Sequence, residues 1–147
     1  MKNIFLSAAA LVLLGAASCS KTDEGISNGW VLNNTSYTTS YTTNSAIGTD
    51  AVFTAVSGTA VGDISFVFTA RPTVTSTYKV GNSPLPGQVK VVADTDPGTT
   101  YNSTGNDNIY ASVSVVDEKL TIHLPSIWVK NIYTHDSVRL AATIIEM

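Results

Sequence analysis

The chain has 147 residues, 11 acidic and eight basic, and a formal net charge of −3 at pH 7. A weakly acidic chain without clustered Lys and Arg excludes binding to nucleic acid through the phosphate backbone. The single cysteine excludes an internal disulfide, and the length suits one domain with a hydrophobic core rather than two.

The first 18 residues have the pattern of a secretory signal peptide. Lys2 gives a positively charged start, residues 4–14 form an uncharged apolar stretch, and small residues precede Cys19. The apolar stretch is too short to span a bilayer as a permanent helix. Cleavage before Cys19 leaves 129 residues, and the loss of Lys2, the only charged residue removed, takes the formal charge from −3 to −4.

Cys19 needs an explanation, because an unpaired cysteine in an exported protein is an intermolecular bridge, a spare thiol or a chemical handle. The stretch Leu14-Gly15-Ala16-Ala17-Ser18-Cys19 resembles the bacterial lipobox, which implies that Cys19 is acylated after cleavage. Ala16 stands where the lipobox usually has leucine, so cleavage after Ala17 to release a soluble protein is the alternative. Two or three acyl chains would hold the protein at a membrane.

Residues 19–29 are predicted to be the lipidated cysteine and a polar tether. Lys21, Asp23 and Glu24 resemble the export signal of surface lipoproteins of the Bacteroidetes group, which implies an outer-membrane protein exposed at the cell surface. The alternative is a solvated linker that only spaces the domain from the lipid.

Residues 30–147 are dense in Thr, Ser, Val, Asn and Gly, which is the composition of strands and turns, and no window shows a convincing helical period. Asn33-Asn34 is predicted to be a tight turn that follows a strand at residues 30–32. A hairpin at Asp117-Glu118-Lys119 is the clearest one in the chain. Further strands are expected at residues 51–57, 63–70, 75–80, 88–93, 109–116, 120–124, 127–129 and 138–145.

These patterns predict a single all-β domain, an antiparallel sandwich or small barrel of about eight or nine strands. Residues 94–108 form the longest stretch without an apolar pattern, so we expect an exposed loop there. The tether, the opening at residues 30–35, the late hairpin and the closing strand resemble the small β-domain lipoproteins of Bacteroidetes, many of which have no assigned function.

The expected loop is the predicted ligand site, with Asp94, Asp96, Tyr101 and Asp107 as its candidates. Asp and Asn oxygens suit calcium, but the spacing matches no EF-hand, and such residues are also ordinary in turns. Two separated histidines and one lipidated cysteine give zinc too few ligands. We therefore predict no cofactor, with calcium as the alternative.

The two histidines do not predict catalysis. His123 alternates with apolar residues on a strand and reads as a solvated side chain, while His135, Asp136 and Ser137 are adjacent in sequence and so point apart rather than form a triad. Asp136-Ser137-Val138 resembles the sequon that Bacteroidetes use for O-glycosylation, which implies Ser137 as the acceptor.

The sequence favours a non-catalytic lipoprotein whose domain binds a glycan or an envelope protein. Sugar rings stack on exposed aromatic side chains, and the candidates are Trp30, Tyr101, Tyr110, Trp128 and Tyr133, each of which could instead lie in the core. Two alternatives stay open. One is a hydrolase of polymers that pairs Asp94 or Asp96 with Asp107, and the other is a structural subunit with an exposed apolar patch or unpaired edge strand.

Overall fold

The computed structural model of the chain describes residues 27–96, 98–106 and 108–147. Cys19, Lys21, Asp23, Glu24 and Asp107 lie outside these ranges, as does the signal peptide. The described residues form ten strands and no helix. The strands are β1 (Gly29–Leu32), β2 (Thr35–Ile47), β3 (Asp50–Ser57), β4 (Asp63–Phe68), β5 (Ser76–Gly81), β6 (Gln88–Asp96), β7 (Thr99–Ser103), β8 (Tyr110–Val116), β9 (Lys119–Asn131) and β10 (Ser137–Ile145).

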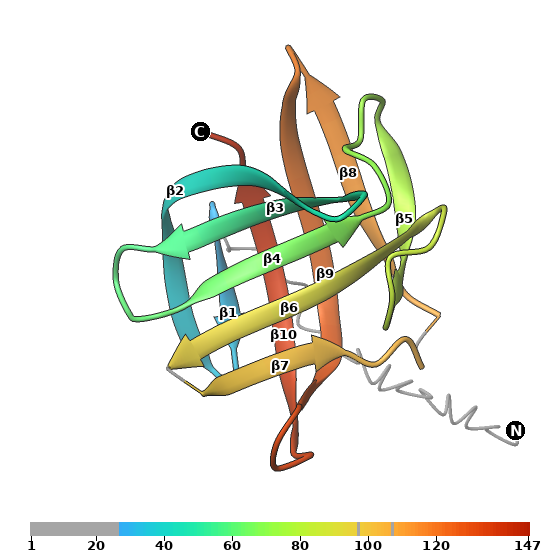
Figure 1. The fold of residues 1–147 in the computed structure, drawn as a ribbon. Coiled ribbons are helices and arrows are strands. Elements are labelled where there is room, and N and C mark those ends of the chain that lie inside the picture. The colour runs from blue at the N-terminus through green and yellow to red at the C-terminus, as the bar shows by residue number, and fades with distance from the viewer. Residues whose placement is uncertain (1–26, 97, 107) are drawn as a thin grey trace, which may run out of the picture.

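The strands form one sheet in the order β10-β1-β2-β3-β4-β6-β5-β8-β9-β7, with additional pairings β10–β9 and β6–β7. These pairings fold the sheet over into two layers, with β3, β4, β6 and β7 crossing in front of β9 and β10 in Figure 1. The all-β, sandwich-like prediction is confirmed. The structure differs in having ten strands rather than eight or nine, and in one parallel pair, β5 with β6.

The core fills the space between the two layers. Ile64, Phe66 and Phe68 alternate with more exposed residues along β4 and are at most 1% exposed, as a strand with one apolar face requires. Trp30 stacks on Tyr37 of the neighbouring strand, with ring centroids 5.0 Å apart. Burial of these large side chains supplies most of the free energy that holds the domain together.

Two predicted turns are confirmed, and both use residues that tolerate left-handed backbone. Asn33 and Asn34 have φ of 47° and 66°, and Asp117 and Glu118 have φ of 51° and 63°. Positive φ at both central residues gives a turn whose twist matches that of the flanking strands. These turns set the registers of β1 with β2 and of β8 with β9.

The prediction of an exposed loop at residues 94–108 is wrong as far as Ser103. β6 continues to Asp96, and Thr99–Ser103 forms β7, which pairs with β6 on one side and with β9 on the other. Tyr101 is half-buried against the core and Ser103 is 2% exposed. A short strand of Thr, Asn and Ser carries little apolar signal, and one of its two partners, β9, is distant in sequence, so composition concealed it.

The strand expected at residues 127–129 could either extend the sheet or cross to another after Pro125; β9 runs without a break through Pro125, so these residues extend it. The register with β10 shifts there, because Ile127 pairs with Leu140 while Leu124 pairs with Ala142. Such a bulge places a residue outside the ladder, which is where a strand tolerates proline. Beyond the bulge, Ile127 and Val129 point into the core and Trp128 points outward. No helix in the described part of the chain is long and apolar enough to cross a membrane.

Candidate functional site

The described ligand candidates lie on two neighbouring strands instead of in a loop. Asp94 lies on β6, Asp96 at the end of the same strand and Tyr101 on β7, with Asp107 outside the described ranges. The Asp94 carboxylate accepts a hydrogen bond from the Thr100 hydroxyl. Among the described residues, no group of three or more His, Cys, Asp or Glu side chains is placed to hold a metal ion.

Asp94 has a carboxylate neighbour that sequence reasoning did not identify. Asp63 on β4 pairs directly with Asp94 on β6, and both line a surface hollow with Val56, Val61, Gly62, Thr95 and Gly98. Partial burial, followed by the charge of Asp94, raises the pKa of Asp63. Like charges directly opposite each other weaken a strand pair. This pair therefore costs stability at neutral pH unless a proton or a partner offsets the repulsion.

The two histidines lie at separate positions. His123 is exposed on β9 and its Nδ1 lies 3.1 Å from the Thr143 hydroxyl of β10. His135 occupies the turn between β9 and β10 with φ of 66°, and its backbone N–H donates to the Asn131 carbonyl. Ser137, the predicted glycosylation site, is exposed at the start of β10.

The five aromatic candidates divide into buried and exposed residues. Trp30 is 1% exposed in the core and Tyr101 packs against it, so neither offers an open ring face. Tyr110, Trp128 and Tyr133 are 49%, 43% and 66% exposed. Trp128 and Tyr133 belong to the β9–β10 hairpin, the orange and red ribbon that extends lowest in Figure 1.

A cationic and aromatic surface lies on the outer face of this hairpin. Trp128 and Lys130 are two residues apart on β9 and point outward together, as do Ser137 and Arg139 on β10. Trp128 pairs with Arg139, and Lys130 pairs with Ser137 on one side and with Asn102 of β7 on the other. We call these five residues, Asn102, Trp128, Lys130, Ser137 and Arg139, the Trp128 surface.

The centre of the Trp128 surface is a cation–π contact. The Arg139 guanidinium carbon lies 4.1 Å from the centroid of the Trp128 ring. In the described part of the chain, neither Arg139 nor Lys130 makes a side-chain hydrogen bond or an ion pair. This contact places the guanidinium over the ring, and its N–H donors bind no polar group within the described residues.

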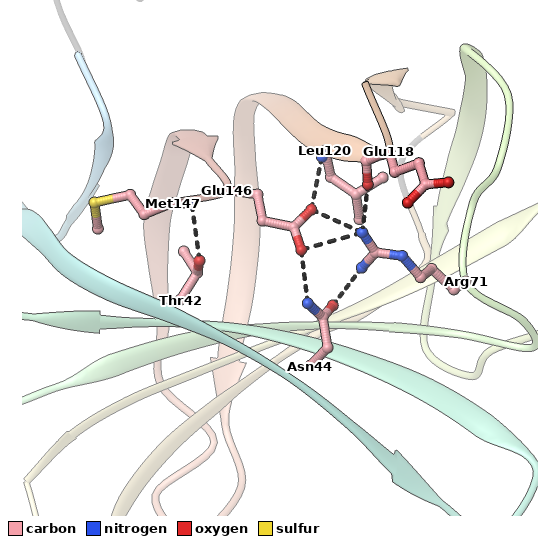
Figure 2. A network of polar contacts seen from close by, with 7 residues as sticks. All are labelled: Thr42, Asn44, Arg71, Glu118, Leu120, Glu146 and Met147. Atoms are coloured by element: carbon pink, nitrogen blue, oxygen red, sulfur yellow. Dashed lines mark hydrogen bonds and ion pairs between the residues drawn. The ribbon is translucent and has the colours of Figure 1, made fainter. Parts of the chain in front are cut away.

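A second arginine, Arg71, has the opposite environment. Figure 2 shows its guanidinium between Asn44 of β2, the Glu118 carbonyl of the β8–β9 turn and Glu146 beyond β10. Its Nη2 lies 2.8 Å from Glu146 Oε2, and Glu146 also accepts hydrogen bonds from the Leu120 backbone N–H and the Asn44 amide. We call Asn44, Arg71, Glu118, Leu120 and Glu146 the Arg71 network.

The Arg71 network connects four segments of the chain at the end of the domain near the C-terminus. Partial burial alone would raise the pKa of Glu146, but hydrogen bonds from Arg71, Leu120 and Asn44 and the charge of Arg71 outweigh it and lower that pKa. Beneath Arg71 lies a cavity of about 60 Å³, lined by Phe53, Phe68 and Leu120 among others. Ligand cavities are typically about 300 Å³ or larger, so this one does not hold a ligand of that size.

Sequence reasoning identified Trp128 as a candidate but missed Arg139, Lys130, Arg71, Glu146 and Asp63. The Trp128–Arg139 pairing follows from the hairpin register, which depends on how the turn at residues 132–136 is built. There Asn131 Oδ1 accepts hydrogen bonds from the backbone N–H groups of Tyr133 and Thr134, a local signal that an Asn at the head of a turn could have given.

Comparison with known proteins gives no relative: no family model, no curated protein and no solved structure matches the chain.

Proposed function

We propose that the protein is an outer-membrane lipoprotein, displayed at the cell surface through acylated Cys19, whose β-domain binds a glycan without catalysing a reaction. The observation that carries the binding role is the Trp128 surface. It combines an exposed aromatic ring, two cations whose side chains make no hydrogen bond or ion pair within the described residues, and the neutral side chains of Asn102 and Ser137. Aromatic stacking and polar side chains at the rim are the usual means of binding a sugar.

The position of Asn28 supports this proposal. Asn28 lies beside the end of β10, where its side-chain oxygen accepts a hydrogen bond from the Ile145 backbone N–H. Arg139 is six residues earlier on β10, which is about 20 Å away along the strand. A chain anchored through Cys19 would therefore approach the domain at one end and leave the Trp128 surface near the other, accessible to large ligands.

A glycan array tests the binding role. We expect the full chain in detergent solution to bind a subset of immobilised glycans, and Trp128→Ala to lose this binding. Tyr41→Ala is the matched control, because Tyr41 is an exposed aromatic residue on a different strand, β2. The array could show no glycan binding, while the protein on intact cells is cross-linked through the Trp128 surface to an envelope protein. That result would contradict the proposed glycan ligand and identify a protein partner.

Proteinase accessibility tests the location. An epitope-tagged copy should be digested on intact cells, and Cys19→Ala should lose its association with the membrane. Protection of the tag until the cells are permeabilised would contradict display at the surface.

One observation favours hydrolysis of a glycan as a second candidate function. Asp63 has a raised pKa and lies next to Asp94, and two carboxyl groups with different environments are the arrangement of glycoside hydrolases. Release of reducing ends from polysaccharides, abolished by both Asp63→Asn and Asp94→Asn, would establish it. The non-catalytic proposal expects no such release.

A further inference from the structure

We infer that the Trp128 surface binds an anionic saccharide, one that carries carboxylate or sulfate groups, and that Arg139 and Lys130 bind those groups. This inference rests on the proposed glycan binding and names the class of glycan. It is carried by the contact between Arg139 and Trp128 and by the neighbouring positions of Arg139 and Lys130, whose side chains make no hydrogen bond or ion pair within the described residues.

The side chains of the two cations on this surface are not used in hydrogen bonds or ion pairs within the described residues. The described residues include six Lys and Arg side chains, Arg71, Lys79, Lys90, Lys119, Lys130 and Arg139. Arg71 is engaged in its network, whereas the side chains of Arg139 and Lys130, like those of the other three lysines, have neither a hydrogen bond nor an ion pair within the described ranges. Arg139 and Lys130 differ from those lysines in lying together beside Trp128. A surface for a neutral sugar would need the aromatic ring but not two free cations.

Arg139 is already held in position to bind an anion. A guanidinium that stacks on a ring presents its N–H groups at the edge of its plane, in a fork that matches the two oxygens of a carboxylate or sulfate. The stack with Trp128 fixes the side chain before the ligand arrives, which lowers the entropy lost on binding.

Lys130 lies on the neighbouring strand, diagonally opposite Arg139, so their Cα atoms are about 7–8 Å apart. It adds a second positive charge within reach of the same ligand. Asn102 and Ser137, in the same row as Lys130, offer an amide and a hydroxyl to neutral sugar hydroxyls. A surface with two positive charges flanked by neutral hydrogen-bonding groups is better suited to a charged saccharide than to a small inorganic anion.

Calorimetric titration of the full chain in detergent solution tests this inference with three probes: polygalacturonate, dextran sulfate and uncharged dextran. We expect binding to at least one of the charged polymers, weakening as salt is added, and no binding to dextran. A preference for polygalacturonate identifies carboxylate as the group bound, and a preference for dextran sulfate identifies sulfate.

Arg139→Ala should weaken binding of the charged polymer by about tenfold or more, since a charge-assisted hydrogen bond is lost. Arg139→Lys keeps the charge but loses the fork, so it should also weaken binding. Lys119→Ala is the matched control: it removes the same charge in the β8–β9 turn region and should leave the affinity unchanged.

Three results would overturn the inference. Equal losses in Arg139→Ala and Lys119→Ala would mean attraction by overall charge and not by this surface. Equal binding of dextran and the charged polymers, sensitive to Trp128→Ala but not to Arg139→Ala, would remove the anionic class and leave the proposed glycan binding intact. If none of the three polymers binds and no glycan on the array binds, both the anionic class and the proposed glycan binding are contradicted.

Discussion

Arg71 and Arg139 are the same residue type in two contrasting environments. Arg71 donates hydrogen bonds through both terminal nitrogens of its guanidinium to the Asn44 side chain, the Glu118 carbonyl and the Glu146 carboxylate, and so it joins segments that are as many as 75 residues apart. Arg139 stacks on one ring and donates no hydrogen bond within the described part of the chain. An arginine whose donors are satisfied internally stabilises the fold, whereas one held in place with free donors is available to a ligand.

The largest expected effect is the loss of the Arg71 network. Arg71→Met removes the ion pair and leaves the Glu146 carboxylate, whose side chain is 10% exposed, with fewer donors. We expect the free energy of unfolding to fall by about 2 kcal/mol, below the value for a fully buried pair because the Arg71 side chain is partly exposed. Urea denaturation measures this loss, and an unchanged midpoint would show that the network contributes nothing.

Acid should weaken the same network. The pKa of Glu146 is lowered in the folded protein, so its contribution to stability is present above the unfolded pKa and is lost as the pH falls through the folded pKa. Glu146→Gln should cost about 1.5 kcal/mol at pH 7, and the difference from the native protein should shrink as the pH is lowered towards 3. A difference that is constant with pH would contradict a role for the carboxylate charge.

Arg139→Met should have a smaller effect on stability than Arg71→Met. An exposed cation–π contact contributes about 0.5–1 kcal/mol, and no ion pair or hydrogen bond is broken. Thermal unfolding followed by circular dichroism checks this. A loss as large as that in Arg71→Met would show that Arg139 is a structural residue.

The smallest effect should have the opposite sign. Asp63→Asn removes the repulsion with Asp94, and we expect a gain of about 0.5 kcal/mol at pH 7. Because the folded pKa of Asp63 is raised, the penalty is present above that pKa and disappears as the pH falls below the unfolded value. Denaturation at pH 7 and pH 3 checks the gain, which should vanish at the lower pH. A loss of stability at pH 7 would show that this carboxylate has a favourable partner.

Local patterns predicted much of the fold. Alternation along Ile64, Phe66 and Phe68, and the turns at Asn33-Asn34 and Asp117-Glu118, are set by neighbouring residues and were predictable. β7 was not, since Tyr101 is its only large apolar residue and one of its two partners, β9, is distant in sequence. The order of the strands in the sheet likewise depends on pairings between β1 and β10 and between β7 and β9, which join distant parts of the chain and which no short window contains.

The candidate site was less predictable than the fold. Trp30 and Trp128 both lie on strands, and only the three-dimensional structure shows that one is buried and the other exposed. The contact of Arg139 with Trp128 requires a known hairpin register, and the pairing of Arg71 with Glu146 requires the whole domain. Composition indicates which side chains are present, but the environment of each charge is a tertiary property.

The central claim is that Arg71 stabilises the fold and Arg139 binds a ligand. Its most direct test is to measure both the free energy of unfolding and the affinity for the charged polymer in Arg71→Met and Arg139→Met, in one buffer. We predict that Arg71→Met unfolds more easily and binds as tightly as the native protein, while Arg139→Met keeps nearly all its stability and loses about tenfold or more in affinity. The account would be contradicted if Arg139→Met lost as much stability as Arg71→Met and still bound the polymer normally.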